Sequence, residues 1–250
     1  SLQSVQIVTP ICPGAVDRCN SSSGQYGVER YRYTAVIDLS AWANCGTDWV
    51  IDWSLCCRNN AITSLNNPGG KDLYLSAELN NTITPCNSSP RFLNDPIPFG
   101  CVNQPIVYNH GVSDLAGDSL RFELAPARGT NGAILPYNAG YTFTQPVITS
   151  GGANAVTIDP QTGTIRFTPS IAQFAVVTVL VTEFRNGVRI GRYTRDLQFA
   201  IIACNNNNPS VSGINGTNSY VFDVCAGTNF CFDVTSTDLD AAQIVTMNWN

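Results

Sequence analysis

Hydrophobic and polar residues alternate along most of this 250-residue chain. In the first hundred residues the alternation is clearest over 30–39, 49–58 and 73–79, where every second side chain is apolar. Successive side chains of a β-strand point to opposite faces, so a period of two predicts half-buried strands. No comparable segment shows the helical period. Residues 1–98 are therefore predicted to form a β-domain.

One segment, residues 49–58, predicts a core face and a solvent face in detail. The polar series is predicted to face solvent: Asp52, Ser54, Cys56 and Arg58. The apolar series is predicted to face the core: Trp49, Ile51, Trp53, Leu55 and Cys57. Trp49 and Trp53 then pack inside the domain, and Trp42, in the loop after Leu39, is the better candidate for an exposed ring that binds carbohydrate.

A proline-rich passage, residues 94–99, interrupts the alternation. Pro96 and Pro98 lack backbone donors and favour an extended, stiff connector. We therefore predict a boundary after residue 98 and a second domain over 99–204.

A long hairpin is predicted within this second domain. Asn186-Gly187 separates two apolar segments, 175–185 and 188–203. Asn-Gly between apolar strands is a strong hairpin signal, because a type I′ turn needs positive φ at both turn residues.

The end of the chain repeats a feature of its middle. Cys101 precedes Asp114 by the same spacing that separates Cys225 from Asp238. A related domain is thus expected over 205–250, which is too short to close a sandwich of about 100 residues. We expect the chain to be a segment of a longer array.

The charge pattern narrows the possible partners. Charged residues make up 12% of the chain, against roughly 25% in typical soluble proteins, and the net charge is −5. Lys71 is the single lysine, and no basic stripe occurs, so nucleic acid is not expected as a partner. No apolar run approaches the roughly 18 residues of a membrane helix, so membrane insertion is not expected either.

Ten cysteines accompany a single histidine, His110. The chain contains no C-x-x-C motif, so the spacing does not favour a zinc site. An even, scattered set indicates disulfides and therefore an oxidising compartment outside the cytoplasm. All ten are predicted to be oxidised: Cys12, Cys19, Cys45, Cys56, Cys57, Cys86, Cys101, Cys204, Cys225 and Cys231.

Strand geometry predicts that Cys56 and Cys57 bond to different partners, because neighbouring side chains on a strand point to opposite faces. Cys101 and Cys204 are the only cysteines of the second domain, which predicts a bridge between its first and last strands. The partners expected for the remaining cysteines are Cys45 for Cys56, Cys86 for Cys57 and Cys19 for Cys12.

Three segments resemble cadherin-like and related bacterial immunoglobulin-like repeats. Asp114–Leu120 is similar to their D-x-D-G-D-S-L turn, Thr157–Pro169 to their strand-turn-strand signature, and Asn94–Phe99 to a cadherin interdomain linker. The resemblance implies an all-β fold of tandem immunoglobulin-like or cadherin-like β-sandwich domains, stapled here by disulfides.

The chain as a whole resembles large secreted surface proteins of gliding Bacteroidota, of the kind exported by type IX secretion. The segments Trp53–Ile62, Asn87–Pro90 and Glu183–Val188 carry this resemblance. It implies an extracellular, cell-surface location in a group that consists mostly of presumed adhesins or surface structures.

The cadherin-like linker raises the question of calcium, which takes six to eight hard oxygen ligands. Asp95, Asp114 and Asp118 are the candidate ligands at the first junction. In the alternative, Asp114 and Asp118 hydrogen-bond the backbone of their own turn. Ala116 stands where the repeats usually carry an acid, so at most weak calcium binding is expected; no other cofactor is.

Catalysis is not predicted. A serine triad would have to use His110, and no G-x-S-x-G motif accompanies it, so a structural histidine is favoured. The strand carboxylates fall on polar faces, as solvated acids do, and a carboxylate-pair glycosidase is the weaker alternative: Glu29, Asp38, Asp52, Glu78, Glu123 and Glu183.

The sequence therefore predicts a non-catalytic structural or adhesive segment of a secreted cell-surface protein, such as an adhesin, filament or surface-layer component. Its expected partners are other copies of itself, neighbouring domains of a longer chain, and surface glycans. One alternative is a carbohydrate-binding module of a secreted hydrolase. Another is a fibre subunit that assembles by strand exchange, because an unfinished sheet leaves an open edge.

Overall fold

The computed structural model divides the chain into two compact units, Ser1–Ile202 and Ala203–Asn250. In the part of the chain that it describes, the regular structure is β-strand and short 3-10 turns, and no helix is long and apolar enough to cross a membrane. The described residues are 2–9, 16–19, 22, 27–38, 49–84, 87–204, 209–217, 219, 224–225, 227, 229–240 and 245–247.

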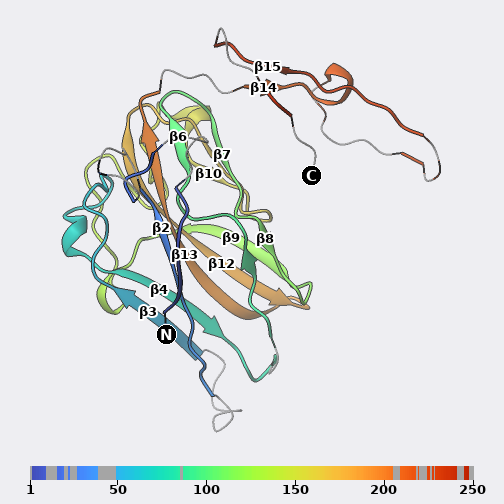
Figure 1. Ribbon diagram of the computed structural model, residues 1–250. Coiled ribbons are helices and arrows are strands. Elements are labelled where there is room, and N and C mark those ends of the chain that lie inside the picture. Colours follow the sequence, from blue (N-terminus) through green and yellow to red (C-terminus); the bar gives the residue numbers. More distant parts are fainter. Residues whose placement is uncertain are drawn as a thin grey trace. The chain divides into compact units, whose positions relative to one another are not determined.

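The first unit contains the strands β1 to β13 (Figure 1). Its 3-10 turns are η2 (Pro68–Gly70), η3 (Thr130–Gly132) and η4 (Gly152–Asn154). Its strands are β1 (Leu2–Ile7), β2 (Glu29–Tyr33), β3 (Trp49–Leu55), β4 (Leu73–Leu79), β5 (Arg91–Phe92), β6 (Phe99–Cys101), β7 (Ile106–Tyr108), β8 (Val112–Ser113), β9 (Ser119–Ala125), β10 (Thr157–Ile158), β11 (Ile165–Phe167), β12 (Gln173–Arg185) and β13 (Val188–Ile202).

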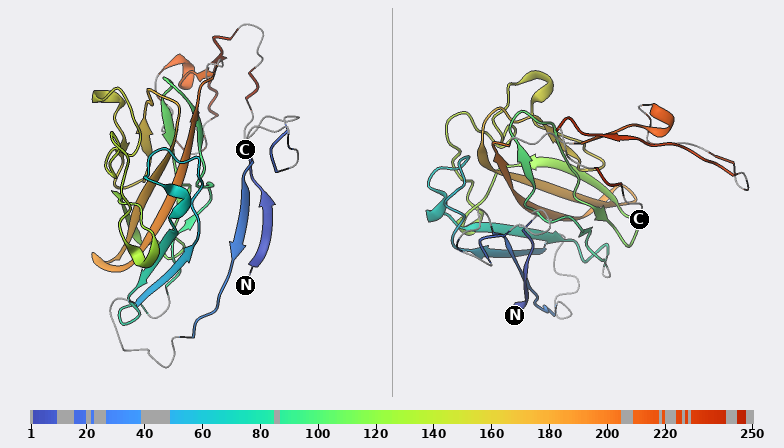
Figure 2. Two further views of the ribbon diagram at one scale, coloured as in Figure 1. Left: turned by 90° about the vertical axis from the view of Figure 1, so that its left-hand side faces the viewer. Right: turned by 45° about the horizontal axis from the view of Figure 1, so that its top comes forward.

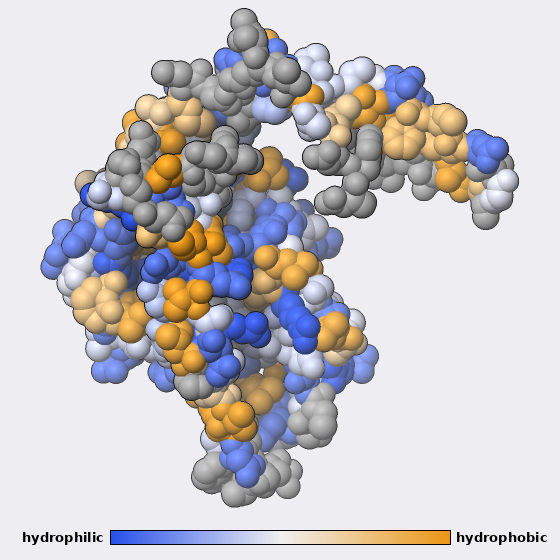
Figure 3. All heavy atoms as spheres, in the orientation of Figure 1, coloured by the Kyte–Doolittle hydropathy of each residue, from blue (hydrophilic) through white to orange (hydrophobic). Residues whose placement is uncertain are grey.

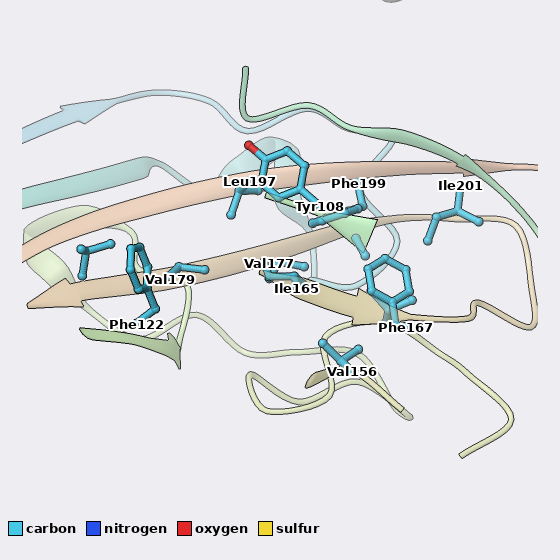
Figure 4. Packing of buried hydrophobic residues seen from close by; sticks show 13 residues of the cluster. Tyr108, Phe122, Val156, Ile165, Phe167, Val177, Val179, Leu197, Phe199 and Ile201 are labelled. Atoms are coloured by element: carbon cyan, nitrogen blue, oxygen red, sulfur yellow. The ribbon is translucent and has the colours of Figure 1, made fainter. Parts of the chain in front are cut away.

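A six-stranded sheet forms the centre of this unit, in the order β3-β4-β13-β12-β9, with β6 parallel to the far end of β13. A three-stranded sheet, β10-β11-β7, lies over it (Figure 2). The main hydrophobic core fills the space between them, as Figure 4 shows. It is built from alternate residues of both layers, among them Tyr108, Phe122, Ile165, Phe167, Val177, Val179, Leu197, Phe199 and Ile201.

The predicted long hairpin is confirmed. β12 and β13 pair antiparallel along their whole length, and Arg185 lies opposite Val188. Asn186 and Gly187 form the turn with φ of 52° and 78°, as a type I′ turn requires.

The sheet crosses the boundary that the sequence places at residue 98. β4 pairs with both β3 and β13, so these two strands of the predicted first domain belong to the same sheet as the hairpin. The carbonyls of Pro96 and Pro98 accept hydrogen bonds from the backbone N–H groups of Gln198 and Ala200, each at 2.9 Å. Proline lacks a donor but keeps its acceptor, so this passage runs along an edge of the sheet instead of linking two domains.

The second unit begins at Ala203, close to the predicted boundary at residue 205. Its described elements are β14 (Ser210–Val211), which pairs antiparallel with β15 (Ser236–Thr237), and the 3-10 turn η5 (Ile214–Gly216). Immunoglobulin-like or cadherin-like repeats therefore stay a hypothesis, whereas the all-β class is confirmed.

The prediction that Cys56 and Cys57 bond to different partners is wrong, because the structure joins them to each other. The prediction assumed a strand through both residues, but β3 ends at Leu55 and its alternation does not extend to them. Their peptide bond is cis and their Cα atoms lie 3.1 Å apart. The partners expected for them, Cys45 and Cys86, lie outside the described residues.

Cys101 and Cys204 are each disulfide-bonded. Cys101 ends β6, which runs parallel to the end of β13, and Cys204 follows β13 by two residues. These positions suit the predicted Cys101–Cys204 bridge, and peptide mapping is the test of that pairing.

Two further cysteines differ from the prediction that all ten are oxidised: Cys19 and Cys231 are free thiols. An even number of cysteines does not determine pairing, because a disulfide also needs Cβ atoms about 4 Å apart. Cys12, the partner expected for Cys19, lies outside the described residues.

The segment Thr157–Pro169 folds as the predicted strand-turn-strand, with β10 antiparallel to β11. The Asp159 carboxylate holds the turn by accepting hydrogen bonds from the N–H groups of Gln161 and Thr162. Gly163 follows with φ of +70°, and a Cβ there would lie 2.6 Å from the Phe122 ring. Both the backbone conformation and the close packing therefore favour glycine at this position.

We expect Gly163→Ala to lower the free energy of unfolding by about 3 kcal/mol, from positive-φ strain and the clash with Phe122 together. Gly187→Ala is the matched control, because Gly187 has φ of +78° and no atom within 4 Å of the added Cβ. Urea unfolding of both variants measures the difference. Equal losses would show that the packing contact contributes nothing.

Candidate functional site: an aromatic groove and an acidic cluster

An open groove of about 770 Å³ lies between β2, with the segment that follows it, and the apolar face of β3 and β4. Hydrophobic side chains are interspersed with polar ones on the surface of the molecule (Figure 3). The groove is lined by Tyr31, Tyr33, Thr34, Ala35, Ile37, Ile51, Asp52, Trp53, Leu55 and Leu75.

The alternation of side chains along β2 and β3 places the aromatic rings in this groove. Tyr31 and Tyr33 are two residues apart on β2 and so share a face. The Tyr33 and Trp53 ring centroids lie 5.8 Å apart, with the planes tilted by 38°. The Tyr31 hydroxyl donates a 2.6 Å hydrogen bond to Glu29, which raises the pKa of the tyrosine.

The apolar series of β3 therefore does not lie in a closed core, contrary to the prediction. Ile51, Trp53 and Leu55 are exposed, and Trp53 keeps 39% of its surface accessible. The cause is position: β3 is the outermost strand of the sheet, so its apolar face meets only the groove. Trp49 donates its indole N–H to Asn81, and Trp42 lies outside the described residues.

The groove has the size and chemistry of a ligand site. Small-molecule sites occupy roughly 300–1,000 Å³ and combine apolar and aromatic walls with a few polar groups. Here three exposed rings supply the walls, and Thr34 is a polar residue among them. Asp52 also borders the groove, although its carboxylate accepts a hydrogen bond from Tyr74. Rings of this kind stack on the apolar face of a flat or cyclic ligand while their polar ends stay in water.

A second candidate is the acidic cluster of Asp114, Asp118 and Glu183, whose carboxylate oxygens lie within 4.8 Å of one another. Asp114 accepts hydrogen bonds from the N–H groups of Ala116 and Asp118, at 2.9 and 3.0 Å. This is the turn-stabilising role that the sequence left open. Glu183 arrives from β12, where it lies opposite Leu120 of β9.

Neutral and cationic partners already occupy most of these carboxylate oxygens. Arg185 donates to both oxygens of Asp118, and this guanidinium lowers the pKa of Asp118. Asn87 donates to both oxygens of Glu183, and Tyr193 donates to one of them at 2.6 Å. Burial raises the pKa of Glu183 nevertheless, with the Asp114 charge adding to the effect.

The cluster does not fit a calcium ion. Its one buried oxygen without a partner is Asp114 Oδ2, whereas calcium takes six to eight oxygens. Asp95, the third predicted ligand, is not in the cluster and instead forms a 2.8 Å ion pair with Arg30. Arg185 supplies the positive charge at this place, so the proposed function does not include calcium.

Glu183 was expected to be solvated, and it is fully buried. Alternation assigns a face but does not say whether that face is covered; here Asn87 and Tyr193 cover it. The sequence offers one signal for the place of Glu183 in this cluster. Pairing Asp118-Ser119-Leu120 with Glu183-Phe184-Arg185 places Glu183 opposite Leu120 and Arg185 next to Asp118.

His110 lies in the aromatic core, as a structural histidine does, and has no exposed surface. Its ring stacks on Phe122 with centroids 5.7 Å apart and meets Tyr108 and Phe92 edge-on. Neither ring nitrogen has a hydrogen-bond partner. Burial, with the Arg195 charge as a second cause, lowers the pKa of His110 to about 4.

No protein-family profile matches the chain, and no curated protein matches it. The groove and the fold are therefore the basis on which its function is inferred.

Proposed function

We propose that this chain is a non-catalytic adhesive segment of a secreted cell-surface protein and that it binds saccharides of its target in the groove between β2 and β3. The observation that carries the proposal is the exposure of three aromatic rings, Tyr31, Tyr33 and Trp53, in one open groove. A contiguous exposed apolar patch rimmed by polar residues marks an interaction surface.

Saccharides suit the groove better than charged ligands do. A pyranose ring offers C–H groups on one face and hydroxyls at its rim. The Tyr33 and Trp53 rings lie with their centroids 5.8 Å apart. Among the described residues of the lining, Asp52 is the only ionisable group besides the tyrosines. The low charge of the whole chain agrees with a neutral ligand.

Other observations support the extracellular placement. Four described cysteines are in disulfides, and such bonds persist outside the reducing cytoplasm. The resemblance of several segments to secreted surface proteins of Bacteroidota points the same way. The buried His110 cannot reach a substrate, so it does not support the alternative of a histidine-dependent hydrolase.

A glycan array followed by calorimetry tests the proposal. We expect Trp53→Ala to weaken binding of the saccharide that the wild-type chain selects by about tenfold, the loss of roughly 1.5 kcal/mol that one aromatic contact contributes. Phe143→Ala is the matched control, because Phe143 is 41% exposed but lies outside the groove lining. Absence of any bound glycan, or equal affinity in Trp53→Ala and wild type, would reject the groove as the site.

A further inference from the structure

Two margins of the six-stranded sheet are protected from pairing with a strand of another molecule. At the β9 margin the Phe122 N–H donates to the carbonyl of Pro160, so the turn after β10 covers the strand. At the β6 margin, Pro96 and Pro98 lead into the strand, and proline offers no donor to an incoming chain. Both are recognised ways of preventing a sheet from pairing with another molecule.

Among the described residues, none protects the β3 margin in this way. β3 forms the outer limit of the sheet (Figure 1), and among the described strands only β4 pairs with it. All seven of its residues are in continuous register with β4, without a bulge. The strand contains no proline and no lysine, Asp52 is its only charge, and Val50 is 56% exposed.

An edge of this kind presents a row of backbone donors and acceptors, and the group that satisfies such a row is another extended strand. We propose that β3 is a self-association edge: it pairs antiparallel with β3 of a second copy of this chain and so continues the sheet from one copy into the other. A two-fold axis makes the interface self-complementary, because both copies contribute the same strand.

Charge selects the register of this pair. A two-fold axis at Trp53 places Asp52 of each copy opposite Ser54 of the other, and Ile51 opposite Leu55. An axis at Asp52 would instead place two carboxylates opposite each other, which is unfavourable. The Trp53 register also brings the two grooves side by side, although the association does not depend on saccharide binding.

Ser54 provides a register-specific test, because in this register it faces Asp52 of the other copy, whereas within its own sheet it lies opposite the uncharged Tyr74. Ser54→Asp creates two like-charge pairs in the dimer, and Ser54→Lys creates two opposite-charge pairs. We expect the dimer dissociation constants of these two variants to differ by roughly tenfold, with wild type between them. Ile134→Lys is the control for adding a charge at an exposed apolar position away from β3.

Analytical ultracentrifugation from roughly 1 µM to about 1 mM measures these constants. Hydrogen exchange at both ends of that range locates the interface, and added protection is expected in Trp49–Leu55. A wild-type chain that stays monomeric at the highest concentration would overturn the proposal, as would equal constants for Ser54→Asp and Ser54→Lys.

The two proposals fail separately. Ser54 alternates with Trp53 and so lies on the face away from the groove, and it is not among the groove residues. Ser54→Asp should therefore bind saccharide as the wild type does. Loss of dimers with retained saccharide binding would implicate β3 alone, whereas dimers without any saccharide binding would reject only the proposed function.

Discussion

Replacing Arg58 by methionine is expected to lower the free energy of unfolding of the first unit by about 3–5 kcal/mol. Arg58 forms a two-pronged ion pair with Asp196 of β13, at 3.0 and 2.9 Å, and the two side chains are only 3% and 7% exposed. It also donates to the carbonyls of Asp72 and Arg128. One side chain thus joins the segment after β3 to the central hairpin.

The loss is large because methionine leaves the Asp196 charge buried. Its carboxylate would keep one hydrogen bond, from Thr178 at 3.1 Å, and lose both bonds to the guanidinium. Removing both charges avoids that cost, so the double variant Arg58→Met, Asp196→Leu should recover part of the lost stability.

Urea unfolding measures these differences, and Arg189→Met is the control. Arg189 pairs with Glu78 at 2.7 Å, but its side chain is 38% exposed, so we expect a loss of less than about 1 kcal/mol. If Arg58→Met lost no more than Arg189→Met, the buried pair would not be holding the segment in place.

The parts of the fold that could be predicted depend on local chemistry. The period of two identified β12 and β13, and Asn186-Gly187 identified the turn between them, because both signals lie within a few residues. The union of β4 with β13 could not be predicted in this way, since it joins Ala77 to Tyr193 through backbone hydrogen bonds that leave no mark on either sequence.

The candidate site shows the same limit. Alternation correctly placed Trp53, Ile51 and Leu55 on one face, but an edge strand and a central strand have the same pattern. For Trp53 the face turned out to be open, and for Glu183 it turned out to be closed. In both cases the answer depends on which distant segment lies against the strand.

Acid is expected to destabilise the first unit through His110. An ordinary histidine has a pKa near 6.5, and in the fold the pKa of His110 is about 4, first because of burial and then because of the Arg195 charge. Between these two values the unfolded chain binds more protons than the folded one. The contribution of His110 to the free energy of unfolding should therefore be greatest above pH 6.5 and fall by about 3 kcal/mol as the pH drops to 4.

His110→Phe isolates this contribution. Phenylalanine keeps a ring against Phe122 but cannot be protonated, and the carboxylates that also titrate in this range are shared by both proteins. The difference in unfolding free energy between wild type and variant, measured by urea unfolding at pH 7, 5.5 and 4, should shift by about 3 kcal/mol in favour of the variant at the acid end. A difference that stays constant across this range would mean that His110 takes up its proton inside the fold as readily as in the unfolded chain. The aromatic cage of Phe92, Tyr108 and Phe122 would then not exclude the charged ring, and the packing that places His110 in the core would have to be revised.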